Sequence, residues 1–143
     1  MAQSSAVEIM PVLSPDGKLV AYTSDESGRY EVYMTSAVEP GPRVTVSTAG
    51  GIEPQWSPDG RTLFFRAPTH FAAAGIQARP LAVTRRDSLF VDRYERYQWH
   101  QAYNVFPDGE HLLLMRRAED KSLPRGRKKK YTACILNLEY LIK

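Results

Sequence analysis

The sequence is poor in cysteine and has no long apolar run. Cys134 is its only cysteine, so an intrachain disulfide and a cysteine-based zinc site are both excluded. The apolar neighbours of Cys134 predict a buried, structural thiol. No stretch approaches the roughly 20 apolar residues that a membrane span requires. The start of the chain, residues 1–10, also lacks the basic and apolar regions of a secretory signal.

Sequence motifs of common catalytic sites are missing as well. No two of the histidines His70, His100 and His111 are three or four residues apart, the spacing of metal-binding pairs on one helix face. The sequence contains no Gly-x-Ser-x-Gly elbow, no Gly-x-Gly-x-x-Gly loop and no P-loop. We therefore expect no catalytic residue, no metal site and no cofactor in this chain, and structural roles for the histidines.

The sequence contains enough apolar residues to form a folded core. Apolar residues make up 43% and charged residues 24% of the 143 residues, which is typical of a globular protein. The 10 prolines and 9 glycines lie scattered between short apolar stretches. This punctuation predicts short strands joined by turns.

A Pro-Asp-Gly turn occurs three times along the chain. The copies are Ser14-Pro15-Asp16-Gly17, Ser57-Pro58-Asp59-Gly60 and Phe106-Pro107-Asp108-Gly109. Their aspartates are 43 and 49 residues apart, close to the ~40–45 residues of a four-stranded propeller blade. Proline pre-sets the turn, aspartate can bond nearby backbone N–H groups, and glycine takes a left-handed conformation. These residues are predicted to be structural; the alternative is that the three aspartates serve as ligands or acid–base groups.

The apolar runs beside each turn predict paired strands. We predict an all-β fold: a partial β-propeller of about three four-stranded antiparallel blades, forming a single propeller segment over residues 1–143. The blades are expected at about 8–48, 52–92 and 101–143. Expected strands are Pro11–Leu13, Leu19–Thr23, Tyr30–Met34, Arg43–Ser47, Leu63–Phe65, Ile76–Val83, Leu89–Val91, Leu112–Met115 and Tyr131–Leu136, with a terminal turn of helix in 137–143.

Two stretches depart from this regular pattern. Phe106 replaces the serine of the first two turns, which should cost a local hydrogen bond. Residues Ala67 to Ala74 predict a looser connection than a tight hairpin. Pro80 lies inside the predicted strand Ile76–Val83, so that strand is expected at an edge or to carry a bulge.

The repeats resemble those of TolB-type, WD-repeat-like propellers. The stretch from Pro11 to Arg66 is similar to the C-terminal propeller of bacterial membrane-anchored serine/threonine kinases. Shared features are Ser14-Pro15-Asp16-Gly17, Ala21-Tyr22, Glu26-Ser27-Gly28-Arg29-Tyr30-Glu31-Val32-Tyr33 and Gly50-Gly51-Ile52-Glu53-Pro54-Gln55-Trp56-Ser57. The ending Ile135-Leu136-Asn137-Leu138-Glu139-Tyr140-Leu141 also resembles that family. The resemblance implies a sensory propeller, extracytoplasmic if it is the tail of such a kinase and otherwise cytoplasmic.

Three blades are too few for a closed propeller, which needs roughly four to eight. An open arc leaves two apolar blade faces uncovered. Three arrangements would cover them: the chain is a piece of a longer gene product, two copies pair into a six-bladed ring, or a partner supplies the missing blades. The first is favoured, because the resembling family carries its propeller on one chain.

Basic charge is concentrated near the end of the chain. From residue 116 onward there are nine basic and three acidic residues, whereas the net charge of the whole chain is +3. The run Arg125-Gly126-Arg127-Lys128-Lys129-Lys130 predicts a solvated hairpin loop. The alternative is contact with nucleic acid or anionic lipid, but the charge sits in one loop without interleaved aromatics. We therefore do not expect nucleic acid as a partner.

The expected partner is a protein or a small ligand on one face of the propeller. Loops that enter the innermost strand, or join the second and third strands, line that face in propellers. The candidate binding residues are Asp25, Arg29, Glu53, Trp99, Gln101 and Tyr103. Trp99 is the strongest single candidate as an aromatic residue among polar neighbours, with packing between blades as the alternative. Trp56 is predicted to be core.

Two functions from different classes fit these features. The first is a non-catalytic binding or scaffold module. The second is the accessory propeller of a prolyl-peptidase-like hydrolase whose catalytic domain is not in this sequence. Fold alone does not decide between them, because propellers host many functions.

Overall fold

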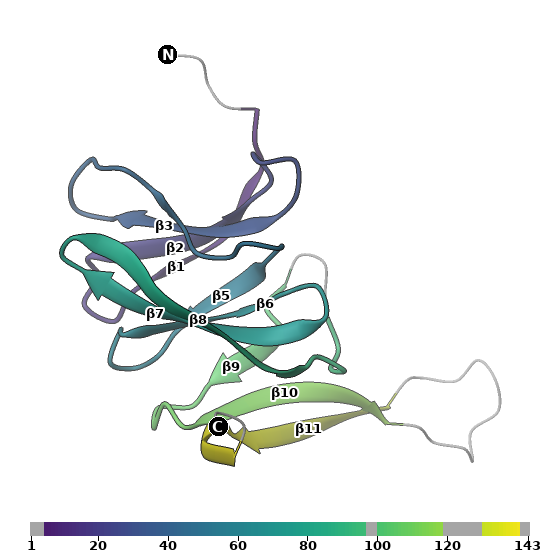
Figure 1. Cartoon of the computed structure of the whole chain (residues 1–143). Helices are drawn as coiled ribbons and strands as arrows, with labels where there is room; N and C mark the ends of the chain where they lie inside the picture. The colour runs from purple at the N-terminus through teal and green to yellow at the C-terminus, as the bar shows by residue number, and fades with distance from the viewer. Residues whose placement is uncertain (1–4, 97–99, 119–129, 141–143) are drawn as a thin grey trace.

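The computed structural model is all-β and describes residues 5–96, 100–118 and 130–140 (Figure 1). Three antiparallel sheets follow one another along the chain, and we call them blades 1, 2 and 3. Blade 1 contains β1 (Glu8–Leu13), β2 (Leu19–Ser24), β3 (Glu31–Ser36) and β4 (Val44–Thr45). Blade 2 contains β5 (Ile52–Trp56), β6 (Thr62–Arg66), β7 (His70–Ala78) and β8 (Leu81–Val91). Blade 3 contains β9 (Tyr103–Val105), β10 (His111–Ala118) and β11 (Lys130–Asn137), followed by the 3₁₀ turn Leu138–Tyr140.

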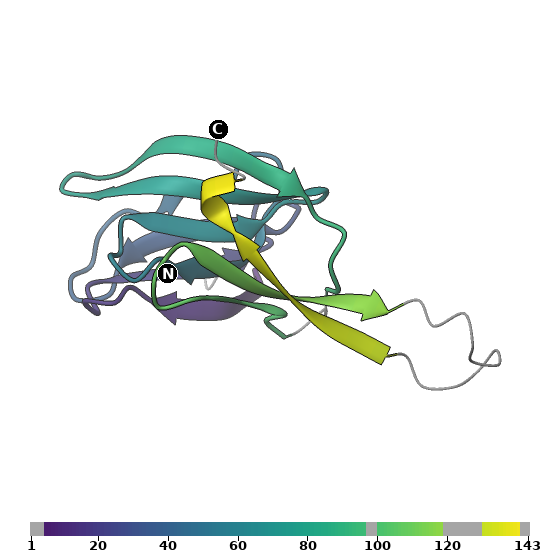
Figure 2. The ribbon, with the colours of Figure 1, turned by 90° about the horizontal axis from the view of Figure 1, so that it is seen from below.

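Within each blade, strands pair with their neighbours in sequence. Blades 1 and 2 are four-stranded meanders, and the described part of blade 3 is a three-stranded meander. The all-β class and the succession of antiparallel sheets confirm the predicted fold. Figure 2 shows the three sheets lying one beyond another, with the β10–β11 hairpin extending past the others.

The later strands of blade 2 correct the prediction. Ile76–Val83 is not one strand: β7 ends at Ala78, Pro80 lies in the turn, and β8 begins at Leu81. A proline cannot donate to a sheet ladder, so this position suits a turn better than a strand interior. Leu89–Val91, expected as a separate fourth strand, is the end of the long β8.

The connection into β7 is also tighter than expected. Ala67 N–H donates to the carbonyl of His70 at 2.8 Å and closes a short hairpin. Phe71 and the three alanines after it are buried in β7 instead of forming a loose segment. Small side chains there allow β7 to pack between the flanking blades.

The three Pro-Asp-Gly turns share one geometry. Gly17, Gly60 and Gly109 have φ of 72°, 71° and 70°, a region that residues with a Cβ resist. Each glycine N–H donates to the carbonyl at the start of its turn, at 2.8–2.9 Å. Each aspartate accepts a hydrogen bond from the backbone N–H two residues later. The turn aspartates are therefore bonded to their own backbone.

The side-chain hydrogen bonds of the turns depend on whether serine or phenylalanine occupies the first position. Ser57 Oγ donates to Asp59 at 2.6 Å and accepts from Thr62 N–H at 3.0 Å, and Ser14 makes the equivalent pair of bonds. Phe106 has no hydroxyl for these bonds. At that turn Asp108 instead contacts the ring of His111, with 2.7 Å between Oδ2 and Nδ1.

Two apolar clusters hold the blades together. One joins blades 1 and 2: Ala21, Val32, Met34, Val46, Trp56, Leu63, Phe65, Ala72 and Ala74. The other joins blades 2 and 3: Phe64, Phe71, Ala73, Leu89, Tyr103, Leu112, Leu114 and Leu138. Alternate residues of β6 enter opposite clusters, because successive side chains of a strand point to opposite faces. Trp56 is core as predicted, and its Nε1 donates to the Val12 carbonyl at 3.2 Å.

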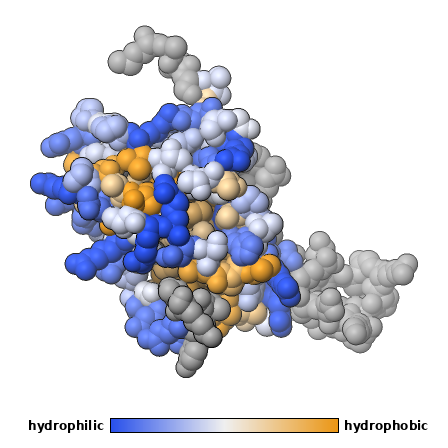
Figure 3. All heavy atoms as spheres, in the orientation of Figure 1, coloured by the Kyte–Doolittle hydropathy of each residue, from blue (hydrophilic) through white to orange (hydrophobic). Residues whose placement is uncertain are grey.

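The outer face of blade 3 has no sheet packed against it among the described residues. Ile135 on β11 is 61% exposed, and apolar side chains are visible at the surface there (Figure 3). Cys134, predicted to be buried, is only half-buried, although it lies opposite the buried Leu114 of β10. Blade 2, by contrast, is covered on both faces.

Candidate functional site

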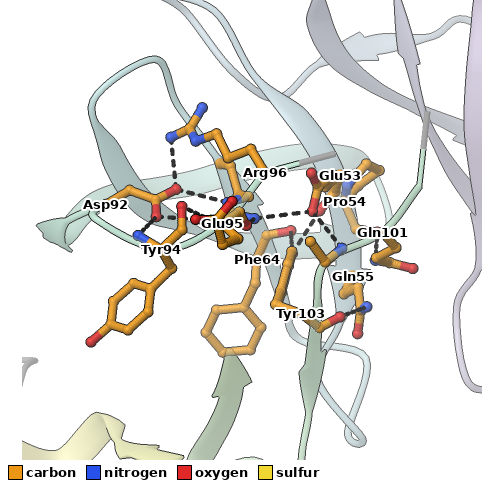
Figure 4. A network of polar contacts seen from close by, with 12 residues as sticks. Glu53, Pro54, Gln55, Phe64, Asp92, Tyr94, Glu95, Arg96, Gln101 and Tyr103 are labelled. Atoms are coloured by element: carbon orange, nitrogen blue, oxygen red, sulfur yellow. Dashed lines mark hydrogen bonds and ion pairs between the residues drawn. The ribbon is translucent and has the colours of Figure 1, made fainter. Parts of the chain in front are cut away.

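A buried charged network lies where blade 2 meets blade 3 (Figure 4). Arg66 makes ion pairs with both Glu53 and Asp92 and is the centre of this network. Arg66 is the last residue of β6, and its side chain is 0% exposed. In blade 1 the matching position is Thr23, which pairs with Ile9 as Arg66 pairs with Ile52. A guanidinium therefore occupies a position where the neighbouring blade needs only a small polar side chain.

Arg66 holds the segment that leads from blade 2 to blade 3. Its Nε and one terminal nitrogen donate to the two oxygens of Asp92 at 2.7 and 2.9 Å. This is the bidentate geometry in which arginine binds a carboxylate most strongly. The guanidinium also donates to the carbonyls of Glu95, at 2.8 Å, and Tyr94, at 3.3 Å. One side chain thus fixes three residues of the connection.

A second arginine closes the same network. Arg96 donates to Asp92 Oδ2 and to the Ala67 carbonyl, both at 2.7 Å. Asp92 therefore lies between two guanidinium groups. Buried charges are tolerated when they are paired and hydrogen-bonded in this way.

Glu53 enters the network from β5. Its backbone has φ of 54°, at a bulge where the β5–β6 register shifts. The side chain is fully buried; Oε2 accepts from Ala102 N–H at 3.1 Å and lies 3.5 Å from Arg66. Oε1 has no hydrogen-bond partner within the described structure. Met10 occupies the equivalent bulge of blade 1, with φ of 55°.

The network shifts the pKa values of its two carboxyl groups in opposite directions. Burial raises the pKa of Glu53, and the Ala102 N–H and the charge of Arg66 offset only part of that effect. Burial would also raise the pKa of Asp92, but the hydrogen bonds and charge of Arg66, with Arg96, outweigh it and lower the pKa. Asp92 is therefore the principal counter-ion of Arg66, and Glu53 interacts with Arg66 more weakly.

Tyr103 and two glutamines join β5 to β9. Gln55 donates to the Tyr103 carbonyl at 2.7 Å and accepts from Val105 N–H at 3.2 Å. Gln101 donates to the Pro54 carbonyl at 3.3 Å. The Tyr103 ring packs edge-on against Phe71, with centroids 4.6 Å apart. Burial raises the pKa of the Tyr103 hydroxyl well above its ordinary value.

Three of the predicted binding residues come together here. Glu53, Gln101 and Tyr103 lie at the junction, but Glu53 and Tyr103 are buried and only Gln101 is exposed. Their binding role stays a prediction.

Asp25 and Arg29 lie apart from the junction, in blade 1. Asp25 accepts from Val7 N–H at 2.8 Å, and Arg29 contacts Glu31 at 2.7 Å and the Thr48 carbonyl at 2.9 Å. Trp99, the strongest candidate of the sequence, lies outside the described residues. The binding role of these three residues also stays a prediction.

Sequence reasoning missed Arg66, Asp92 and Arg96. They belong to no motif and are separated by up to 30 positions, so spacing could not link them. One usable signal was a charged residue ending the apolar strand Thr62–Arg66. Within residues 5–96, 100–118 and 130–140, no cluster of three His, Cys, Asp or Glu residues could hold a metal ion. No helix in this part of the chain is long and apolar enough to cross a membrane.

Solved structures with similar folds are propellers. An oligogalacturonate lyase from Vibrio parahaemolyticus superposes with a TM-score of 0.69 at 11% identity, over 96% of this chain and 40% of that one. The acylaminoacyl peptidase of Pyrococcus horikoshii gives 0.63 at 19%, over 96% and 24%. A candidate TolB of Agrobacterium tumefaciens gives 0.57 at 15%, over 96% and 50%. This chain thus spans half or less of each of these proteins.

No protein-family model matches the sequence, and no curated protein matches it closely enough to count as a relative. At such low identities the structural similarities establish the fold and nothing finer. Together with the three successive sheets, they define the fold of the chain as a partial β-propeller.

Proposed function

We propose that this chain is a non-catalytic binding module within a larger β-propeller, comparable to the sensory propeller of a receptor-like kinase. The Arg66 network carries the proposal. Arg66 and Arg96 both bond to Asp92 in the connection between blades 2 and 3, and these bonds make the junction rigid. A rigid junction keeps the adjoining loops in fixed positions for recognition.

The described surface at this junction includes an exposed polar group. Gln101 is exposed and donates to the carbonyl of Pro54, in the strand β5 that also supplies Glu53. The partner proposed for this face is a protein or a small ligand. The uncovered faces of blades 1 and 3 are, in this proposal, covered by further blades, supplied by a longer chain or by a second copy.

A photo-crosslinking amino acid at position 101 tests the binding role in cells. The matched control carries the same amino acid at the exposed Glu39 of blade 1, whose side chain has no ion pair within the described structure. The expected result is a discrete product from position 101 that the control lacks. Identical products from both positions, or none from either, would contradict the proposal.

Activity assays test the non-catalytic part separately. The purified chain is expected not to turn over an oligogalacturonate or an acylaminoacyl peptide. Saturable turnover that copurifies with the chain and disappears in the Tyr103→Phe variant would contradict it.

The similarity to acylaminoacyl peptidase supports a second candidate, the accessory propeller of a hydrolase. In that case a hydrolase domain belongs to the same protein. Sequencing the flanking reading frame separates the two candidates, since a kinase domain with a membrane helix supports the first and a nucleophile elbow supports the second.

A further inference from the structure

A groove with an acidic rim lies between the turn ends of blades 2 and 3. It has a volume of about 520 Å³, within the range of binding clefts. Glu53 lies near the start of β5, and the strand leads at its other end into the turn at Ser57, so the groove lies at the end of the blades opposite the Arg66 network. Phe64, Ala73 and Leu138 line its buried, apolar part.

Carboxylates dominate the rim. The groove is lined by five acidic residues, Asp59, Asp87, Asp108, Glu110 and Glu139, and by one basic residue, Arg85. Its formal charge is therefore −4, although the whole chain carries +3. Arg85 contacts Asp87 at 3.1 Å and neutralises that carboxylate alone. Asp108 contacts the His111 ring, and among the described residues no lysine or arginine forms an ion pair with the other four carboxylates.

The fold brings two of these carboxylates together from distant positions. Leu138 N–H donates to the Glu110 carbonyl at 2.7 Å, which seats the 3₁₀ turn beside the third Pro-Asp-Gly turn. Glu110 and Glu139 are both exposed, and neither makes an ion pair within the described structure. They are free to meet a cationic group.

The equivalent groove one blade earlier provides an internal comparison. It lies between the turn ends of blades 1 and 2 and is lined by Asp16, Asp59 and Arg61, a formal charge of −1. The turn aspartates are common to both grooves because they build the turns. The added carboxylates at Asp87, Glu110 and Glu139 are therefore specific to the second groove and are not required by the repeat.

We propose that the groove between blades 2 and 3 binds a peptide segment of a partner protein that alternates lysine or arginine with apolar residues. The acidic rim complements the cationic heads, and the apolar part accommodates the side-chain stems and the apolar residues between them. Asp59 and Asp108 keep their charge into acidic solution. The Ser57 hydroxyl and the Arg61 N–H lower the pKa of Asp59, and the Glu110 N–H lowers that of Asp108.

This inference adds a second surface to the proposed binding role and is tested independently of it. The probe is a dye-labelled Lys-Leu-Lys-Leu-Lys peptide, titrated with the 143-residue chain and followed by fluorescence polarisation. The groove variant is Glu110→Gln with Glu139→Gln. The control variant, Glu8→Gln with Glu39→Gln, removes the same formal charge from exposed positions outside the groove. Gln-Leu-Gln-Leu-Gln is the uncharged control peptide.

Saturable binding to the wild-type chain is expected, about fivefold or more weaker in the groove variant and unchanged in the control variant. Added salt should weaken it. Equal binding by all three proteins, or equal loss in both variants, would show that net charge acts without the groove and would overturn the proposal. Light scattering that shows self-association abolished by the groove variant would assign the groove to a second copy and would also overturn it.

Discussion

The hydroxyl of Tyr103 on β9 donates to the backbone carbonyl of Glu53 on β5 at 2.6 Å, and the Phe64 carbonyl lies 3.1 Å from the same oxygen. Both residues were singled out from the sequence as ligand contacts. In the structure they contact each other and join two blades. A carbonyl at a β-bulge lies outside the regular ladder, so the phenol supplies a bond that the sheet does not.

Removing that hydroxyl should destabilise the fold without disturbing its packing. We expect Tyr103→Phe to lower the free energy of unfolding by about 1–3 kcal/mol, because a buried carbonyl loses its partner. Urea unfolding followed by fluorescence measures the change. Tyr94→Phe is the control, since the Tyr94 ring packs on Phe90 and no hydrogen bond of its hydroxyl is found in the described structure. Equal effects of the two substitutions would contradict this role for Tyr103.

Replacing Arg66 should be more costly. Arg66→Met leaves the buried carboxylates of Asp92 and Glu53 without their shared cation, and a loss of about 3–5 kcal/mol is expected. Arg66→Lys keeps the charge but not the two parallel bonds to Asp92, so it should lose stability to a smaller extent. If the methionine variant does not fold, the lysine variant still tests the geometry: stability equal to wild type would show that the bidentate pair is dispensable.

Asp92 should stabilise the fold in its ionised form. Its pKa is lowered from 3.8 because the bonds and charge of Arg66, with Arg96, outweigh the effect of burial. A carboxyl group whose pKa is lowered by folding contributes stability above its unfolded pKa and loses that contribution as the pH falls through the folded pKa. The stability gap between wild type and Asp92→Asn should therefore be wide near neutral pH and narrow below about pH 4. A gap independent of pH would contradict this.

Glu53 should show the opposite dependence. Burial raises its pKa above 4.5, so its protonated form is favoured in the folded state. Protonated Glu53 contributes fully to the stability of the fold below its unfolded pKa, and this contribution is lost as the pH rises through its folded pKa. Glu53→Gln should therefore gain stability relative to wild type as the pH rises above about 4.5. Unfolding curves across this range measure it, and a relative loss with rising pH would refute it.

The serine turns offer a fifth test. Ser57→Ala removes the hydroxyl that links Asp59 to Thr62 N–H, and a loss of about 0.5–1.5 kcal/mol is expected from chemical unfolding. Thr84→Ala on the exposed part of β8 serves as the control, with a change within about 0.5 kcal/mol. A similar change in both variants would mean that the turn hydroxyl is not a stabilising group.

The turns and the repeat could be predicted because their causes are local. Glycine at positive φ, aspartate bonded to its own turn and proline before it all act within a few residues. Phe106 at the third turn was also understandable locally, because a missing hydroxyl means a missing bond. The pairing of β1 with β2 across the first turn follows from the apolar runs on its two sides.

Blade 2 was misread where local signals conflict. Strand β7 is rich in alanine, which has a low strand preference, whereas Ile76–Val83 has the branched side chains typical of strands. The long β7–β8 pairing overrides that preference. The pairing of Arg66 with Asp92 could not be predicted, because it depends on how the connection after β8 folds back onto β6. Long-range pairing of charges leaves no periodic mark in a sequence.

Successive turns also touch one another. A Cβ built on Gly60 would lie 3.5 Å from Pro15, and one built on Gly109 would lie 3.3 Å from Pro58. In both pairs of successive turns, the proline of one turn lies beside the glycine of the next, so the same two motif positions form the contact. After a blade is gained by gene duplication or lost by deletion, the turns that become neighbours would already carry the proline and the glycine of this contact. Changes in blade number during evolution would therefore need no newly invented contact at this end of the propeller.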